Sequence, residues 1–159
     1  MLDLIFAVKF VHLVAAAAML GTWLGIAMFM LLAHRSGNPS VVAVTSRFAV
    51  TAEKRVMIAA LALQPVSGFA LAAAIGISPS GEFWLVLSLA LYVLVSAAWI
   101  AALRTEIRIR DLTRQAALDN VPLSEAYRAL FRRYSALTWP ALAATVLLFL
   151  LMTWQPKLP

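Results

Sequence analysis

The sequence predicts an all-α fold: a polytopic membrane protein in which four transmembrane helices form a bundle. Of its 159 residues, 64% are hydrophobic and 13% are charged, whereas soluble globular domains carry about 25% charged residues. The mean hydropathy is +0.91. Four apolar stretches are each long enough to cross about 30 Å of hydrocarbon at about 1.5 Å per residue. We expect one transmembrane domain covering residues 1–159.

The four predicted spans cover approximately residues 4–33, 56–77, 83–103 and 136–154. The first is far longer than the apolar core of a signal peptide, about 7–15 residues, and no basic segment precedes it, so we expect it to remain as a helix. The chain has no cysteine, which excludes disulfides, iron–sulfur clusters and cysteine zinc sites. His12 and His34 are the only histidines, so an all-histidine metal site within one chain is not expected.

Lysine and arginine are distributed unevenly between the two ends of the predicted helices. Eleven lie in the first and third connections, against two in the N- and C-terminal segments. The eleven are Arg35, Arg47, Lys54, Arg55, Arg104, Arg108, Arg110, Arg114, Arg128, Arg132 and Arg133. By the positive-inside rule, both connections are cytoplasmic and both termini are outside, an N-out/C-out orientation in the bacterial cytoplasmic (inner) membrane. The isoelectric point is near 10.5, but these positions predict contact with the lipid bilayer and its anionic headgroups, not with nucleic acid.

The connections between the spans are predicted to be partly helical. Residues 104–135 are expected to extend spans three and four as a cytoplasmic helical hairpin, because nothing breaks a helix over 104–118. "DNVP" (119–122) is typical of a turn, and Ser124 is a suitable N-cap for the following helix. "GNPS" (37–40) marks another turn, after which a short interfacial helix could lead into the second span.

The charged residues of these connections suggest ion pairs. Glu106 and Arg110 have the favourable i, i+4 spacing, and Glu53 is expected to pair with Lys54 or Arg55. The hairpin carries seven arginines and four acidic residues, a net charge of +3. This charge fits either a basic collar near headgroups or a surface that docks a partner protein.

His12 is the residue in the first span that most needs an explanation. It lies roughly 12 Å along the helix from Leu4, too deep for a short side chain to reach water, and its ring needs hydrogen-bond partners. One interpretation is a hydrogen bond to a neighbouring helix. The other is an axial ligand to haem iron through Nε2, with Nδ1–H held by an acceptor. Lys9, one turn earlier, is either a headgroup anchor or part of the same site.

The rest of the candidate site follows from helical periodicity. Ala16, Met19 and Trp23 share the helix face of His12, whereas Gly21 and Gly25 form a G-x-x-x-G on the other face that lets another helix approach. In the second span, "LQPVSG" places Pro65 where it should kink the helix. Gln64 and Ser67 would then line a cavity beside His12 or stabilise a packed kink. The predicted cofactor-binding residues are His12, Lys9, Ala16, Met19, Trp23, Gln64 and Ser67, with His12 as the metal ligand and haem b as the cofactor; no catalytic residue is identified.

The first helix resembles a known family. "KFVH", the small residues that follow it and His34 are similar to the first helix of the HemJ-type protoporphyrinogen oxidases, in which a first-helix histidine binds haem b. The resemblance implies haem b at His12. The lysine that this family has in its third span has no counterpart in "FWLVLSLALYVLVSAAWI".

A second resemblance extends over most of the chain. "LQPVSGFALA", "FWLVLSLALYVLVSAAWIAALRTEIRIRDL" and "YRALFRRYSALTWPALAATVLLFLLMTWQPK" resemble the bacterial family of small integral membrane proteins catalogued as domain of unknown function 2269. This resemblance implies the architecture and leaves the activity open.

Three functions are compatible with these residues. The first is a cytochrome b-like, haem b-binding redox protein of the cytoplasmic membrane, with His12 as axial ligand and a redox protein as its partner. Its second ligand would come from Lys9, from His12 of another copy of the chain, or from water or substrate, so either a two-fold dimer or an open sixth position is possible. The chain is expected to form a homo-oligomer. The second is a non-catalytic subunit or scaffold that docks a partner through the Arg-rich hairpin. The third is a quinone- or small-molecule-binding protein that uses the cavity at Pro65.

Overall fold

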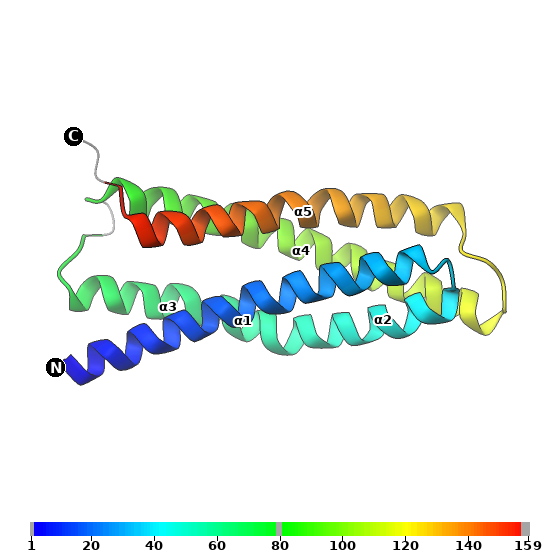
Figure 1. The fold of residues 1–159 in the computed structure, drawn as a ribbon, viewed down its shortest axis with the longest axis horizontal. Helices are drawn as coiled ribbons and strands as arrows, with labels where there is room; N and C mark the ends of the chain where they lie inside the picture. The colour runs from blue at the N-terminus through cyan, green and yellow to red at the C-terminus, as the bar shows by residue number, and fades with distance from the viewer. Residues whose placement is uncertain (1, 79–80, 157–159) are drawn as a thin grey trace.

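The structure is a computed structural model that describes residues 2–78 and 81–156. It is an elongated bundle of antiparallel helices (Figure 1). The elements are α1 (Leu2–Arg35), α2 (Pro39–Ala52), the π-helical turn η1 (Glu53–Met57), α3 (Ile58–Ala74), α4 (Phe83–Leu118) and α5 (Glu125–Trp154). The described residues contain no β-strand.

The predicted four-helix membrane architecture is confirmed. Because α2, η1 and α3 follow one another without a break, they form one helix, and four helices are long and apolar enough to cross a membrane. The longest, α4, has 36 residues and measures about 54 Å at about 1.5 Å per residue. The hydrocarbon layer is about 30 Å thick, so part of each long helix extends beyond it.

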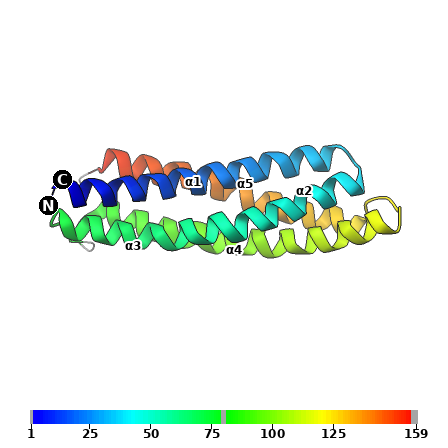
Figure 2. The ribbon, with the colours of Figure 1, turned by 90° about the horizontal axis from the view of Figure 1, so that it is seen from below.

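The turns 36–38 and 119–124 lie together at one end of the bundle, which we call the arginine-rich end (Figures 1 and 2). The opposite end holds the chain termini and the connection between α3 and α4. Gly37 has φ +65°, a conformation that glycine adopts without steric cost, and the Asn38 side chain caps α2. Ser124 caps α5 through the backbone N–H of Tyr127, as predicted. The helical hairpin is therefore present, while its cytoplasmic location remains a prediction.

The first connection differs from the prediction. In place of a separate interfacial helix, the second membrane helix begins at Pro39, well before the predicted residue 56, and runs to Ala74. No glycine or proline interrupts the chain between Pro39 and Pro65. Val42 and Val50 are buried in the bundle, so packing against other helices stabilises the segment in helical form.

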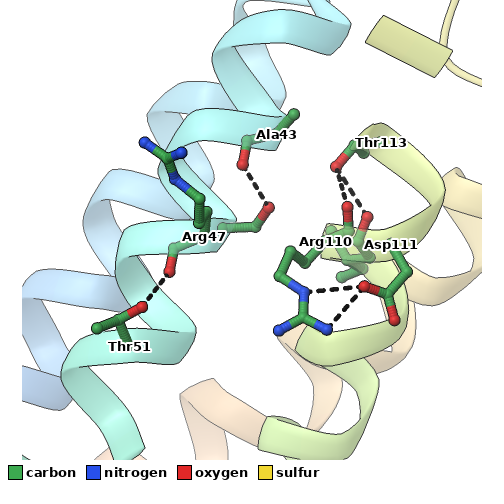
Figure 3. A network of polar contacts seen from close by, with 8 residues as sticks. Ala43, Arg47, Thr51, Arg110, Asp111 and Thr113 are labelled. Atoms are coloured by element: carbon green, nitrogen blue, oxygen red, sulfur yellow. Dashed lines mark hydrogen bonds and ion pairs between the residues drawn. The ribbon is translucent and has the colours of Figure 1, made fainter. Parts of the chain in front are cut away.

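Two predicted ion pairs are wrong. Arg110 binds the adjacent Asp111, with 2.7 Å between Nη2 and Oδ1, and does not bind Glu106 (Figure 3). Glu53 is fully buried, whereas its neighbours Lys54 and Arg55 are exposed. Sequence spacing had suggested surface pairs, but both glutamates face the inside of the bundle.

The core follows the face of α1 that carries His12. Met19, Trp23, Ile26 and Met30 are buried, and the glycine face of the same helix meets no side chain that a Cβ at Gly21 or Gly25 would touch. Trp23 packs with Met57, Trp99 and Leu142 in the central cluster. The G-x-x-x-G therefore remains free of packing within the chain, and a homo-oligomer remains a prediction.

Candidate ligand site around His12

A cavity of about 410 Å³ lies between α1, α3, α4 and α5 in the half of the bundle that contains the termini. Small-molecule sites commonly measure about 300–1,000 Å³ and are mostly apolar. The walls are mainly apolar, with side chains such as Leu13, Phe69, Leu89 and Phe149. His12 is among the few polar residues at its surface. The cavity is therefore suited to a lipophilic ligand with few polar groups.

The His12 ring is held by a hydrogen bond from α1 to α3. Its Nδ1 lies 2.8 Å from the Ser67 Oγ, and that hydroxyl lies 2.6 Å from the carbonyl oxygen of Leu63. A carbonyl only accepts, so the single Ser67 proton is donated to Leu63. Both contacts are then hydrogen bonds only if the Nδ1–H of His12 donates to Ser67. In this tautomer Nε2 carries a lone pair and is available to a ligand.

Two further contacts determine the position of His12. The Gln64 side chain donates from Nε2 to the backbone carbonyl of His12 at 3.3 Å. On the next turn, a Cβ built on Gly68 would lie 3.4 Å from the Cε1 of the ring. Gly68 thus leaves room for the imidazole to lie close to the α3 backbone, and larger side chains at this position would displace it.

Pro65 lies inside α3, and the backbone carbonyl opposite it has a partner that the sequence did not indicate. Proline has no N–H to donate to the carbonyl four residues earlier, that of Leu61. The Tyr92 hydroxyl of α4 donates to this carbonyl. Tyr92 also lines the cavity, so the proline links α3 to α4 beside His12.

The structure brings most of the predicted site residues together. The cavity is lined by Lys9, His12, Ala16, Met19 and Gln64. Ser67 is not among the lining residues, but its hydroxyl contacts the Nδ1 of His12. Trp23 is not among the lining residues. It is 0% exposed and packs deeper in the bundle, because the face of α1 that begins at the cavity continues into the core.

Sequence reasoning missed the contributions of α4 and α5. Trp84, Ser88 and Tyr92 of α4 and Met152 of α5 also line the cavity. These residues are far from His12 in the sequence, and only the packing of the helices brings them there. Trp84 lies near a predicted membrane boundary, and an aromatic residue there is more simply interpreted as an anchor than as part of a ligand site.

His34 is partly exposed and contacts side chains of α5. Its Nδ1 lies 2.9 Å from the Tyr127 hydroxyl, and its ring stacks on Phe131 with centroids 3.8 Å apart. These contacts join α1 to α5 near the arginine-rich end. The two histidines therefore lie at opposite ends of α1, and His34 has no part in the cavity.

Within residues 2–78 and 81–156, no three histidine, cysteine, aspartate or glutamate side chains gather as a metal site. A metal bound directly by the protein at His12 would have a single histidine ligand from this chain. Iron held by a porphyrin needs only axial ligands from the protein, so this arrangement is compatible with haem.

Together, the four apolar helices define an all-helical integral membrane protein with a ligand-sized cavity between them. The chain belongs to the family described as "Predicted integral membrane protein (DUF2269)", whose model matches residues 6–156. No curated protein and no solved structure matches the chain. The first-helix resemblance to HemJ-type oxidases has no counterpart among these findings.

Proposed function

We propose that the protein is a haem b-binding redox protein of the bacterial cytoplasmic membrane, with the Nε2 of His12 as an axial ligand. The observation that carries the proposal is the Ser67 hydrogen bond at Nδ1, which leaves Nε2 unprotonated beside an apolar cavity. Metal-binding histidines are typically oriented in this way, because an acceptor at the second ring nitrogen selects the tautomer and makes the ligand more basic.

The polar residues of the cavity suit the two parts of haem. The porphyrin is flat and apolar, in keeping with the aliphatic and aromatic walls. Its propionates are anionic, and Lys9 lines the cavity one turn from His12, toward the end of the bundle that holds the termini. When bound, haem would supply one-electron redox chemistry. The protein would hold the macrocycle, orient the imidazole and exclude water.

Quinone binding is the principal alternative for the same cavity. A quinone carbonyl is a hydrogen-bond acceptor and needs a donor. Two of the cavity's donors are engaged in the fold: the Tyr92 hydroxyl donates to Leu61, and the Nδ1 of His12 faces Ser67, which leaves the Lys9 ammonium as a donor for a quinone. A lone pair at Nε2 attracts a metal rather than a carbonyl oxygen, so we favour haem.

Titration with ferric haem tests the proposal. The purified protein in lipid nanodiscs should bind haem and develop a Soret band typical of histidine ligation. His12→Ala should reduce the affinity at least a hundredfold, because no other histidine lines the cavity. His34→Ala is the matched control: it removes the other histidine, which is packed against Phe131, and should leave the Soret band unchanged.

Four results would contradict the proposal. Equal haem binding by the wild type and His12→Ala would place the haem elsewhere. A spectral loss in His34→Ala that equals the loss in His12→Ala would point to disturbed folding. Absence of haem binding, with quinone bound instead, would favour the small-molecule alternative. If neither binds, the scaffold alternative remains, in which the arginine-rich end docks a partner.

A further inference from the structure

Two glutamates are buried side by side within the bundle, away from the His12 cavity. Glu53, in the π-helical turn η1, and Glu106, on α4, are both 0% exposed. Their side chains are close enough to interact directly. Glu53 lies eleven residues before Gln64 in the same continuous helix, about 16 Å along it at about 1.5 Å per residue. The pair is therefore separate from the proposed haem site.

Within residues 2–78 and 81–156, no basic side chain forms an ion pair with either glutamate. The ion pairs among the described residues involve Asp111 and Glu125 and neither buried glutamate. The nearest basic residues in sequence, Lys54, Arg55, Arg104 and Arg108, are all exposed. All four carboxyl oxygens lack a hydrogen-bond donor among the described residues. Two ionised carboxylates in such surroundings would repel each other and lose hydration without compensation.

One proton resolves this problem. A carboxylate only accepts hydrogen bonds, whereas a carboxylic acid can donate one. If one of the two groups is protonated, it donates to the other, and the pair carries a single negative charge. Carboxyl pairs that share a site titrate in this way because both cannot ionise together.

The side chains that interact with the pair come from α4 and α5. Tyr134 of α5 is the titratable neighbour, and its buried hydroxyl has no hydrogen-bond partner among the described residues. The indole of Trp99, on α4, lies beside Glu53, and its Nε1–H is likewise unpartnered. These unpartnered donors can stabilise the remaining negative charge.

The chemistry of the site favours a proton over a metal cation. A hard cation such as Ca²⁺ takes about six to eight oxygen ligands. Here two carboxyls are accompanied by an indole N–H, which cannot ligate a metal, and no third acidic or histidine side chain joins them in the described residues. The π-helical turn at Glu53 is a second sign of function, because such turns occur frequently at functional sites.

We propose that Glu53 and Glu106 form a proton-binding site, in which the two carboxyls share one exchangeable proton. Buried carboxyls in membrane bundles commonly serve proton transfer. The proton exchanges between the carboxyl pair and water, and no other atom is transferred. This site does not depend on haem binding at His12.

Infrared titration of the protein in lipid nanodiscs tests this proposal. At neutral pH the wild type should show the C=O band of a protonated carboxylic acid, which shifts in D₂O because the proton exchanges. The double variant Glu53→Gln/Glu106→Gln should lose this band. Each single glutamine variant should shift it and convert a coupled titration into that of one group. Glu125→Gln is the control, because Glu125 is exposed and pairs with Arg128 and Arg132; it should leave the band unchanged.

Several outcomes would overturn the proposal. One is absence of the carboxylic acid band from the wild type at neutral pH, and another is its persistence in the double variant. Loss of the band on adding Na⁺ or Ca²⁺ at constant pH would identify a cation site instead. If the double variant does not fold, the two single glutamine variants provide the test. A shared proton would be contradicted if both keep the wild-type position of the carboxylic acid band and the wild-type titration.

Discussion

Replacing Trp23 with alanine should lower the free energy of unfolding by about 3 kcal/mol. Trp23 is 0% exposed and packs against Met57, Trp99 and Leu142, so its removal leaves a cavity where α1 meets the other helices. Tryptophan-to-alanine changes in soluble cores cost about 3–5 kcal/mol. We expect the lower end, because membrane helices separate into lipid, which solvates apolar side chains well. The unfolding equilibrium would change about a hundredfold.

Unfolding in mixed micelles of increasing denaturing detergent, followed by circular dichroism, measures this effect. Trp154→Ala is the matched control, since Trp154 is 71% exposed at the end of α5. It should change the free energy of unfolding by less than about 0.5 kcal/mol, as is usual for surface positions. Equal destabilisation by the two variants would show that the central cluster is not packed as described.

The second large effect is expected from Ser67→Ala, which should weaken haem binding about 10–100-fold while leaving His12 in place. The Ser67 hydroxyl is the acceptor for the Nδ1–H of His12, and it is itself fixed by the Leu63 carbonyl. Without it, the ring loses both its orientation and its preferred tautomer. When a metal-binding histidine loses the hydrogen bond at its other ring nitrogen, the metal affinity typically falls about 10–100-fold.

Ser88→Ala provides a control within the same cavity. Ser88 also lines the cavity and donates to a carbonyl on its own helix, that of Trp84, at 2.7 Å, but it has no hydrogen bond to histidine. Haem titration should show an affinity close to the wild type for Ser88→Ala. Ser67→Thr should restore most of the affinity, because the hydroxyl remains. Equal affinities in Ser67→Ala and the wild type would remove the tautomer argument.

Much of the fold could be predicted because a membrane requires long apolar helices. Hydropathy located the four spans, and a 100° period placed Ala16, Met19 and Trp23 on the His12 face of α1, where the structure buries all three. Ser124 was also identified correctly as the N-cap of α5, whereas the start of the second membrane helix at Pro39 was not predicted. These features depend on local sequence alone, so no knowledge of packing was needed. The orientation depends on the membrane itself and remains a prediction.

The candidate site was only partly predictable. His12, Gln64 and Ser67 could be connected because an imidazole within a span needs a partner and a proline kink supplies polar neighbours. The role of Tyr92 could not be predicted, because nothing in the local sequence indicates which helix donates a hydrogen bond to the carbonyl of Leu61. Pro65 gave the only signal, by showing that this carbonyl would lack its usual donor.

The buried glutamate pair was missed for a specific reason. Glu53 and Glu106 each stand close to basic residues in the sequence, and that pattern normally indicates ion pairs at a surface. In the structure both glutamates lie on the inner face of their helix, whereas the arginines and lysines beside them lie on exposed faces. The length of the second membrane helix would have been a useful signal, because continuing it back to Pro39 makes Glu53 an internal helix position.

The visible absorption spectrum of the protein isolated from haem-supplied cells tests the central claim most directly. We predict one haem per chain with a Soret band in the wild type, and a colourless but membrane-inserted protein for His12→Ala. The same band in both proteins, or no band in either, would contradict His12 as the haem ligand.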